Sequence, residues 1–126
     1  MKVLITGGAG YLGTVLTEEI LNRFPHAKVI IYDNLMYKQD GLFSFFKYPK
    51  DRFEFVYGDV RDKESLLEQL QKLDKDNDYV IPLAAIVGFP ACARDEKLAT
   101  AVNFEHVKYI VQSTKCRIIY PNTNSG

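Results

Sequence analysis

The sequence predicts an α/β protein built on a doubly wound parallel sheet. Apolar runs typical of buried strands alternate with segments whose apolar residues recur at helical spacing. The connections are short, and a glycine-rich turn joins the first strand to the first helix. Such alternation places helices on both faces of the sheet, in three αβα layers. Right-handed crossovers then give the strand order 3-2-1-4-5.

Five apolar runs are the predicted strands. The second is apolar almost throughout, which is typical of a strand buried on both faces. Pro82 lies inside the fourth run, an awkward residue for a central strand because it cannot donate a ladder hydrogen bond. The five runs span residues 2–6, 28–33, 52–59, 78–85 and 116–121.

Three segments with helical spacing connect these strands. We expect a helix from about residue 11 to residue 23, with Pro25 marking its end. A second helix follows Asp62, a residue that can cap it, and a third covers about residues 95–113. The apolar residues expected to face inward are Leu12, Val15, Leu16 and Ile20, then Leu66, Leu67, Leu70 and Leu73, and finally Val107, Ile110 and Val111.

Residues 34–50 show no clear period and contain the aromatic run LFSFFKYP at residues 42–49. Two interpretations stay open for this run. It forms a wall or lid near a substrate, or it packs against another part of a longer protein or a partner subunit.

Composition excludes several classes of function. The 126 residues carry 16 basic and 16 acidic side chains, so no net basic face predicts binding to nucleic acid. We find no apolar stretch of the length a membrane span needs and no signal peptide, which predicts a cytoplasmic protein. Two cysteines without a C-x-x-C motif, and two distant histidines, make neither a disulfide framework nor a metal site.

The stretch TGGAGYLG, residues 6–13, follows the first strand and opens the first helix. It contains Gly8-x-Gly10-x-x-Gly13 and the looser Gly7-x-x-Gly10-x-x-Gly13. Glycines here permit a tight turn, close approach of a pyrophosphate to the backbone, and close packing of helix on sheet. Amide groups at a helix N-terminus attract anions. The motif in this context predicts a Rossmann-like, dinucleotide-binding fold.

Asp33 ends the second strand, 20 residues after Gly13. A carboxylate at that point can accept hydrogen bonds from both ribose hydroxyls of an adenosine. It would repel a 2′-phosphate, and no basic residue follows before Lys38. The sequence therefore favours NAD over NADP, although Asp33 could instead cap a turn with Asn34.

Five motifs occur in order along the chain: TGGAGYLG, YDNL, GDVRD, LAAIVG and PNTNSG. In this order and spacing they resemble the N-terminal part of extended short-chain dehydrogenases/reductases of the NAD-dependent nucleotide-sugar epimerase/dehydratase type. The resemblance covers essentially all 126 residues. It implies that the chain is a single NAD-binding domain, residues 1–126.

The resemblance also implies roles for individual residues. Thr123 matches the hydroxyl that polarises the reacting oxygen, and Ser125 is a candidate substrate contact. Without the resemblance, Asp59 could be a turn aspartate, Asn103 a solvated polar residue, and PNTNSG a turn. The implied cofactor-binding residues are Gly7, Gly10, Tyr11, Leu12, Gly13, Asp33, Asn34, Asp59, Val60, Leu83, Ala84, Ala85 and Asn103.

The chemistry implied by the resemblance is reversible hydride transfer between a sugar carbon and NAD. A tyrosine removes a proton, and a lysine four residues later lowers the pKa of that tyrosine. No Tyr-x-x-x-Lys motif follows Thr123 before Gly126. We therefore expect the chain alone to bind dinucleotide weakly and to turn over no sugar. The nucleotide-sugar substrate, and the choice among epimerisation, dehydration and reduction, would depend on residues beyond Gly126.

Two further hypotheses follow from the missing pair. A non-catalytic dinucleotide-binding or redox-sensing module on the same fold would also lack it, although PNTNSG favours the enzyme. Methyl transfer on a similar sheet is disfavoured by the ordered motifs.

The fifth strand would leave an open apolar edge, which predicts a homodimer or other self-association.

Overall fold

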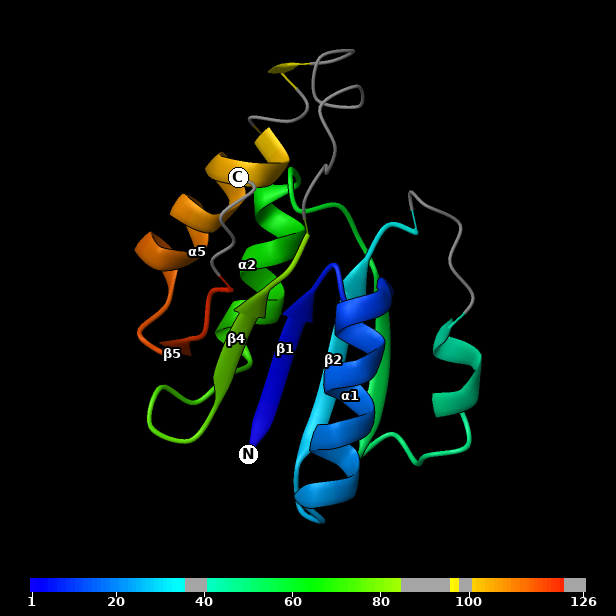
Figure 1. The fold of residues 1–126 in the computed structure, drawn as a ribbon. Helices are drawn as coiled ribbons and strands as arrows, with labels where there is room; N and C mark the ends of the chain where they lie inside the picture. Colours follow the sequence, from blue (N-terminus) through cyan, green and yellow to red (C-terminus); the bar gives the residue numbers. More distant parts are fainter. Residues whose placement is uncertain (36–40, 85–95, 98–100, 122–126) are drawn as a thin grey trace.

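The computed structural model describes residues 1–35, 41–84, 96–97 and 101–121, and within them five strands form one parallel sheet. The order is β3-β2-β1-β4-β5, so the predicted fold class and strand order are confirmed. All neighbouring strands pair in parallel, and the arrows of β1, β2 and β4 point the same way in Figure 1. The strands are β1 (Lys2–Thr6), β2 (Lys28–Asp33), β3 (Phe53–Tyr57), β4 (Tyr79–Pro82) and β5 (Arg117–Ile118).

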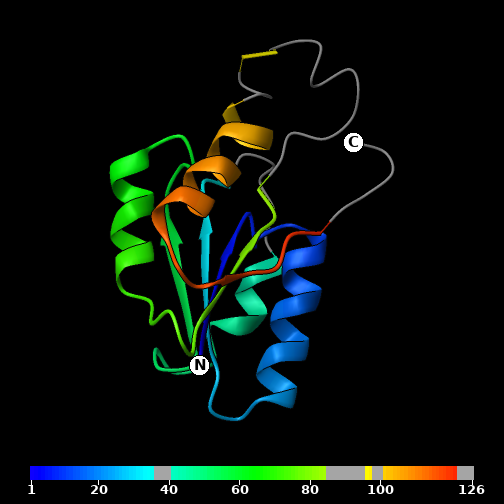
Figure 2. The ribbon, with the colours of Figure 1, turned by 90° about the vertical axis from the view of Figure 1, so that its left-hand side faces the viewer.

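Helices cover both faces of the sheet, which gives the three predicted layers (Figure 2). One face carries α1 (Tyr11–Arg23) and the short 3₁₀ helix η1 (Gly41–Phe45). The other carries α2 (Lys63–Gln71), the π-helical segment η2 (Ala101–Glu105) and α5 (His106–Ser113).

The central strand β1 divides its side chains between two cores because alternate residues point to opposite faces. Val3 and Ile5 pack under α1, whereas Leu4 packs under α2 and α5. All three are almost fully buried, as expected for a strand with a neighbour on each side and a helix on each face.

Helix α1 has the predicted bounds, and its predicted inward face is half confirmed: Leu16 and Ile20 are partly buried against the core. Its buried residues are Gly13, Thr17 and Leu21. Leu12 and Val15 were expected inside and are 47% and 42% exposed. At Gly13 the helix approaches the sheet closely: a Cβ atom there would lie 2.4 Å from Gly8 in the glycine turn. Large side chains could not fit at that distance.

Helix α2 agrees with its prediction. The Asp62 carboxylate accepts a hydrogen bond from the backbone N–H of Ser65 at 3.2 Å, which makes Asp62 the N-cap. Leu66 and Leu70 are buried in the core. The spacing of leucines therefore predicted the packed face correctly.

The third predicted helix is interrupted. A π-helical segment, η2, precedes α5. Val111, which was expected inside, is 58% exposed, and His106 is buried in its place beside Ile110. Val102, His106 and Ile110 recur at a spacing of four, so the inward face includes a histidine that a search for apolar residues omits.

The fifth strand is much shorter than the predicted run of residues 116–121. Only Arg117 and Ile118 pair with β4, and the N–H of Ile119 adds a hydrogen bond to the carbonyl of Val80 at 2.9 Å. Ile119 and Tyr120 are each 53% exposed. Self-association through this edge stays a prediction.

The aromatic run after β2 belongs in part to the core of this chain. Leu42 and Phe45 are buried against the α1 face of the sheet, and the rings of Phe45 and Phe53 have centroids 5.4 Å apart. Phe46 is 53% exposed. Leu42 and Phe45 thus pack within the β2–β3 connection of this chain, a role that neither sequence interpretation considered.

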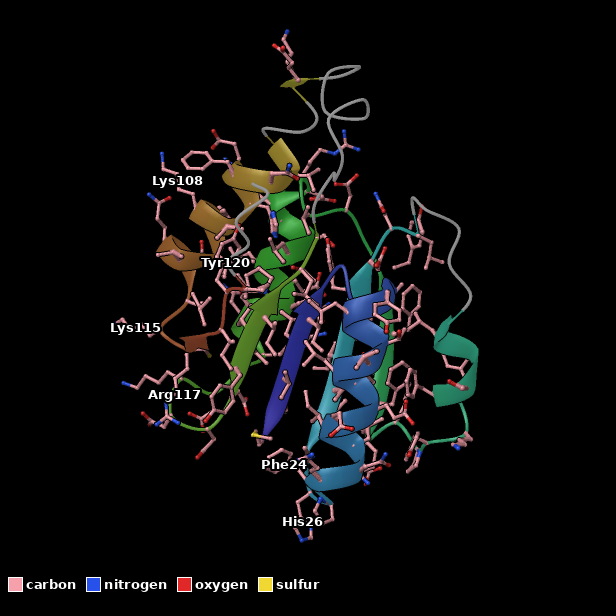
Figure 3. All side chains as sticks on the ribbon, in the orientation of Figure 1. Phe24, His26, Lys108, Lys115, Arg117 and Tyr120 are labelled. Carbon is pink, nitrogen blue, oxygen red and sulfur yellow. The ribbon has the colours of Figure 1, made fainter. Side chains whose placement is uncertain are left out.

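The two histidines lie in different parts of the molecule. His26 lies beyond the carboxyl end of α1, next to Phe24 at the lower edge of the fold (Figure 3). His106 is buried between α5 and β1. Within the described ranges no three His, Cys, Asp or Glu side chains are grouped to hold a metal ion, and no helix is long and apolar enough to cross a membrane.

Candidate functional site

Four segments meet at the carboxyl ends of the strands. They are the glycine turn at residues 7–10, Asp33–Asn34 after β2, Asp59–Val60 after β3, and Leu83–Ala84 after β4. The glycine turn leaves β1, the strand at which the chain order reverses between β2 and β4. In open α/β sheets this reversal creates the crevice in which ligands bind.

The glycine turn packs tightly between its neighbours. Gly7 has φ +72°, a left-handed conformation that favours glycine. Its N–H donates to the carbonyl of Tyr32 at 2.8 Å, and a Cβ atom on it would lie 2.4 Å from the Cα of Ala84. Any larger residue would push β1 away from the segment after β4.

The start of α1 offers unpaired backbone donors. Its N-cap is Gly10, which has no side chain to cap the helix, and its first turn contains no acidic residue. The N–H groups of Tyr11 and Leu12 therefore find no acceptor within the helix. By contrast, α2 begins with the carboxylate cap of Asp62 and carries Glu64 in its first turn. Of these two helix starts, that of α1 is the one suited to an external anion.

Asp33 connects strand β2 to the glycine turn. Its Oδ2 accepts from the N–H of Ala9 at 3.0 Å, and its Oδ1 accepts from the N–H of Leu35 at 2.7 Å. The second bond closes a turn in which Leu35 has φ 56°. Asp33 therefore caps the turn after β2, and its role as a ribose acceptor stays a prediction. Each carboxylate oxygen keeps a second lone pair for a ligand hydroxyl.

Asp59 is an ionised carboxylate held on several sides. Arg61 donates to it through Nη2 at 2.6 Å and Nε at 3.0 Å, and Asn34 donates through Nδ2 at 3.5 Å. The Arg61 side-chain hydrogen bond is the largest influence and lowers the pKa of Asp59, while partial burial opposes it. The carboxylate is therefore an acceptor at neutral pH.

Tyr32 lies under residues 58–62, the connection between β3 and α2 that we call the Asp59 loop. Sequence reasoning missed this tyrosine. Its side chain is fully buried, and its hydroxyl lies 2.9 Å from the Asp59 carbonyl oxygen and 3.0 Å from Ser65 Oγ. Burial is the main reason that the pKa of Tyr32 is raised. Gly58 is needed beside it, since a Cβ atom there would lie 2.4 Å from the ring. The available signal was an aromatic residue immediately before Asp33 in a buried strand.

A cavity of about 220 Å³ opens beside the Asp59 loop, between the starts of α2 and α5. Tyr109 lines this cavity, and the Tyr109 hydroxyl donates to the carbonyl of Lys63 at 3.3 Å. The lining residues are Val60, Arg61, Lys63, Glu105, His106 and Tyr109. The buried Val60 therefore contributes to both the core and this cavity.

His106 joins α5 to the end of β1. Its Nδ1 contacts the carbonyl of Val102, and its Nε2 lies 3.4 Å from the hydroxyl of Thr6, the residue just before the glycine turn. Burial lowers the pKa of His106, so the ring is neutral and can accept from Thr6. The sequence, read alone, had assigned this histidine no partner.

The remaining predicted residues are placed as follows. Leu83 donates its N–H to the carbonyl of Thr6 at 2.8 Å, so the segment after β4 stays beside the glycine turn. Asn103 is half-buried in η2. Ala85, Thr123 and Ser125 lie outside the described residues, and their roles stay predictions.

Comparison with known proteins gives a consistent set of relatives. The profile of the NAD dependent epimerase/dehydratase family matches residues 3–124. The chain is 29% identical over 129 residues to CDP-paratose 2-epimerase of Salmonella typhi. It is 32% identical over 116 residues to dTDP-D-glucose 4,6-dehydratase of Dictyostelium discoideum. These alignments cover 98% and 90% of the chain, but only 37% and 26% of the two relatives.

A solved structure resembles the fold closely. The dTDP-glucose 4,6-dehydratase of Streptomyces venezuelae, determined with NAD bound, superposes with a TM-score of 0.76 at 27% identity. The match covers 90% of this chain and 35% of that protein. The chain therefore spans about a third of the length of such relatives, and corresponds to their N-terminal part.

Proposed function

Since the chain belongs to the NAD dependent epimerase/dehydratase family, we propose that it forms the NAD-binding part of a nucleotide-sugar epimerase or dehydratase. The observation that carries the proposal is the pairing of an uncapped helix start with a carboxylate. Helix α1 begins at Gly10 without a side-chain cap, and Asp33 reaches the same turn through Ala9. A diphosphate and its neighbouring ribose need those two kinds of group side by side.

The residues present fit a dinucleotide. The N–H groups of Tyr11 and Leu12 would receive the pyrophosphate, because the Tyr11 side chain, 85% exposed, leaves the helix start open. Gly13 supports this arrangement by letting α1 approach the sheet. Asp33 would accept from the ribose hydroxyls, with Asn34 beside it.

The two ends of the cofactor would lie along neighbouring strands. Asp59 and Val60 would flank the adenine ring, since Asp59 supplies an ionised acceptor for an amino group. Leu83 and Ala84 would line the path of the nicotinamide half, together with Ala85 and Asn103. Bound NAD supplies a hydride acceptor for a carbon of the sugar. Thr123 would polarise the reacting oxygen, and Ser125 would contact the substrate.

The choice of NAD over NADP tests the proposal directly. Unfolding of the chain is followed by circular dichroism with each dinucleotide, and a ligand at about 100 times its Kd adds about 2.7 kcal/mol to the free energy of unfolding. We expect stabilisation by NAD to exceed that by NADP. Asp33→Asn should weaken NAD binding about tenfold or more, because it removes charge-assisted hydrogen bonds.

Glu19→Gln is the matched control, since it neutralises an exposed carboxylate on α1 that pairs only with Arg23, outside the site. It should leave the preference between dinucleotides unchanged. Equal or stronger stabilisation of the wild-type chain by NADP would contradict the role proposed for Asp33. Absence of stabilisation by either dinucleotide would contradict the proposed function.

A further inference from the structure

We propose that Tyr32 is a positioning residue for adenine recognition: its buried hydroxyl holds the Asp59 loop in the geometry that selects a purine with a 6-amino group. The proposal rests on the function proposed above, in which Asp59 accepts from the adenine ring. It adds a residue that touches no part of the ligand and acts through the loop alone.

The hydroxyl has one proton and two neighbours, which determines its hydrogen bonding. The Asp59 carbonyl can only accept, so Tyr32 donates to it at 2.9 Å. Ser65 Oγ, at 3.0 Å, then donates to the tyrosine oxygen. The backbone of the Asp59 loop is thereby linked to β2 and to the first turn of α2 at one point.

A second contact holds the carboxylate of the same residue. Asn34 Nδ2 lies 3.5 Å from Asp59 Oδ2. Tyr32 therefore holds the backbone carbonyl of Asp59, and Asn34 contacts its side-chain carboxylate. Tyr32 and Asn34 flank Asp33 on the same strand end. Residues 32–34, at the end of β2 and just after it, would therefore position both the ribose acceptor and the adenine acceptor.

The packing leaves the ring of Tyr32 little freedom. The side chain has no solvent-exposed surface, and the Gly58 backbone lies where a Cβ atom would be 2.4 Å from the ring and 2.5 Å from the hydroxyl oxygen. A buried hydroxyl without a partner is costly. The ring therefore keeps its hydroxyl at the Asp59 carbonyl, and the loop cannot slide without breaking that bond.

The test compares NAD with nicotinamide hypoxanthine dinucleotide, which carries a 6-oxo group in place of the 6-amino group. The Kd of each is measured by calorimetry for the wild-type chain and for Tyr32→Phe. A loop held for adenine gives the wild type a lower Kd for NAD. In Tyr32→Phe we expect the ratio of the Kd for the hypoxanthine analogue to the Kd for NAD to fall about fivefold. This is the change typical of one net hydrogen bond.

A purely structural role would change both Kd values alike and leave their ratio intact, which would overturn the proposal. Tyr79→Phe is the matched control, because Tyr79 begins β4, at the end of the strand away from the site. Its hydroxyl there pairs with Arg117. Asp59→Asn provides the coupling test: if Tyr32 acts through Asp59, Tyr32→Phe should no longer change the ratio in that background.

Gly58→Ala gives an independent second test, including the case in which Tyr32→Phe does not fold. Its methyl group would displace the ring without removing any hydrogen-bonding group, and the same loss of preference is expected. An unchanged ratio in either variant contradicts the role of Tyr32. A wild-type chain that binds neither dinucleotide would instead contradict the proposed function itself.

Discussion

Replacing Gly13 by alanine tests the close contact on which the glycine turn depends. Alanine in a helix is favoured over glycine by about 1 kcal/mol, so without a collision the change would stabilise the chain. The added Cβ atom, however, would lie 2.4 Å from the Cα and carbonyl oxygen of Gly8, whereas ordinary contact begins at 3.4 Å. The obstacle is backbone, which cannot rotate away as a side chain could.

Overpacking of this kind costs about 1–3 kcal/mol. A rigid obstacle about 1 Å too close belongs at the upper end of that range. After the helix-propensity gain is subtracted, we expect Gly13→Ala to lower the free energy of unfolding by about 1–2 kcal/mol. The measurement is urea unfolding followed by far-ultraviolet circular dichroism, with the slope unchanged and the midpoint lowered.

The control for this experiment is Gly41→Ala. A Cβ atom there would meet only the Thr14 side-chain methyl, at 3.1 Å, and Gly41 is exposed. Its free energy of unfolding should change by less than about 0.5 kcal/mol. If Gly13→Ala proved more stable than the wild type, the sign alone would refute the contact between α1 and the glycine turn.

Two predictions concern titratable groups. Burial lowers the pKa of His106, so the unfolded chain binds its proton first, and the free energy of unfolding should fall as the pH drops below about 6.5. Urea unfolding between about pH 7.5 and about pH 5.5 measures this fall, and His106→Gln should reduce it; an equal fall in the variant would contradict burial of a neutral ring. The second prediction is that Arg61→Gln raises the pKa of Asp59, because the Arg61 hydrogen bond is the main cause of its lowering. Carboxyl-carbon NMR titration tests it, with Lys63→Gln as a control that should leave the pKa unchanged, and a low pKa retained in Arg61→Gln would refute the assignment.

Some features of the site were predictable from the sequence because they depend on neighbours along the chain. Gly10 and Pro25 delimit α1, and the Asp62 cap lies three residues before the Ser65 amide that it binds. Asp33 follows a buried strand and precedes a turn, so its place at the strand end was predictable. Local sequence carries all of these signals.

Other features depend on residues that are distant in sequence. Tyr32 meets Asp59, 27 residues later, and Thr6 meets His106, 100 residues later. Helix α5 buries His106 one turn before Ile110, whereas the pattern of apolar residues favoured Val111. No pattern within a single element specifies such pairs.

The sequence by itself determined that five strands form, their order, and the ends of β1 and β2, because period, turn residues and crossover handedness are local or general constraints. Only the tertiary structure decided which face of α1 turns inward and which side chain supports the Asp59 loop. The physical reason is that both depend on the distance between packed elements. Close packing converts small differences in that distance, such as the missing Cβ atoms of Gly13 and Gly58, into the choice of which residues touch.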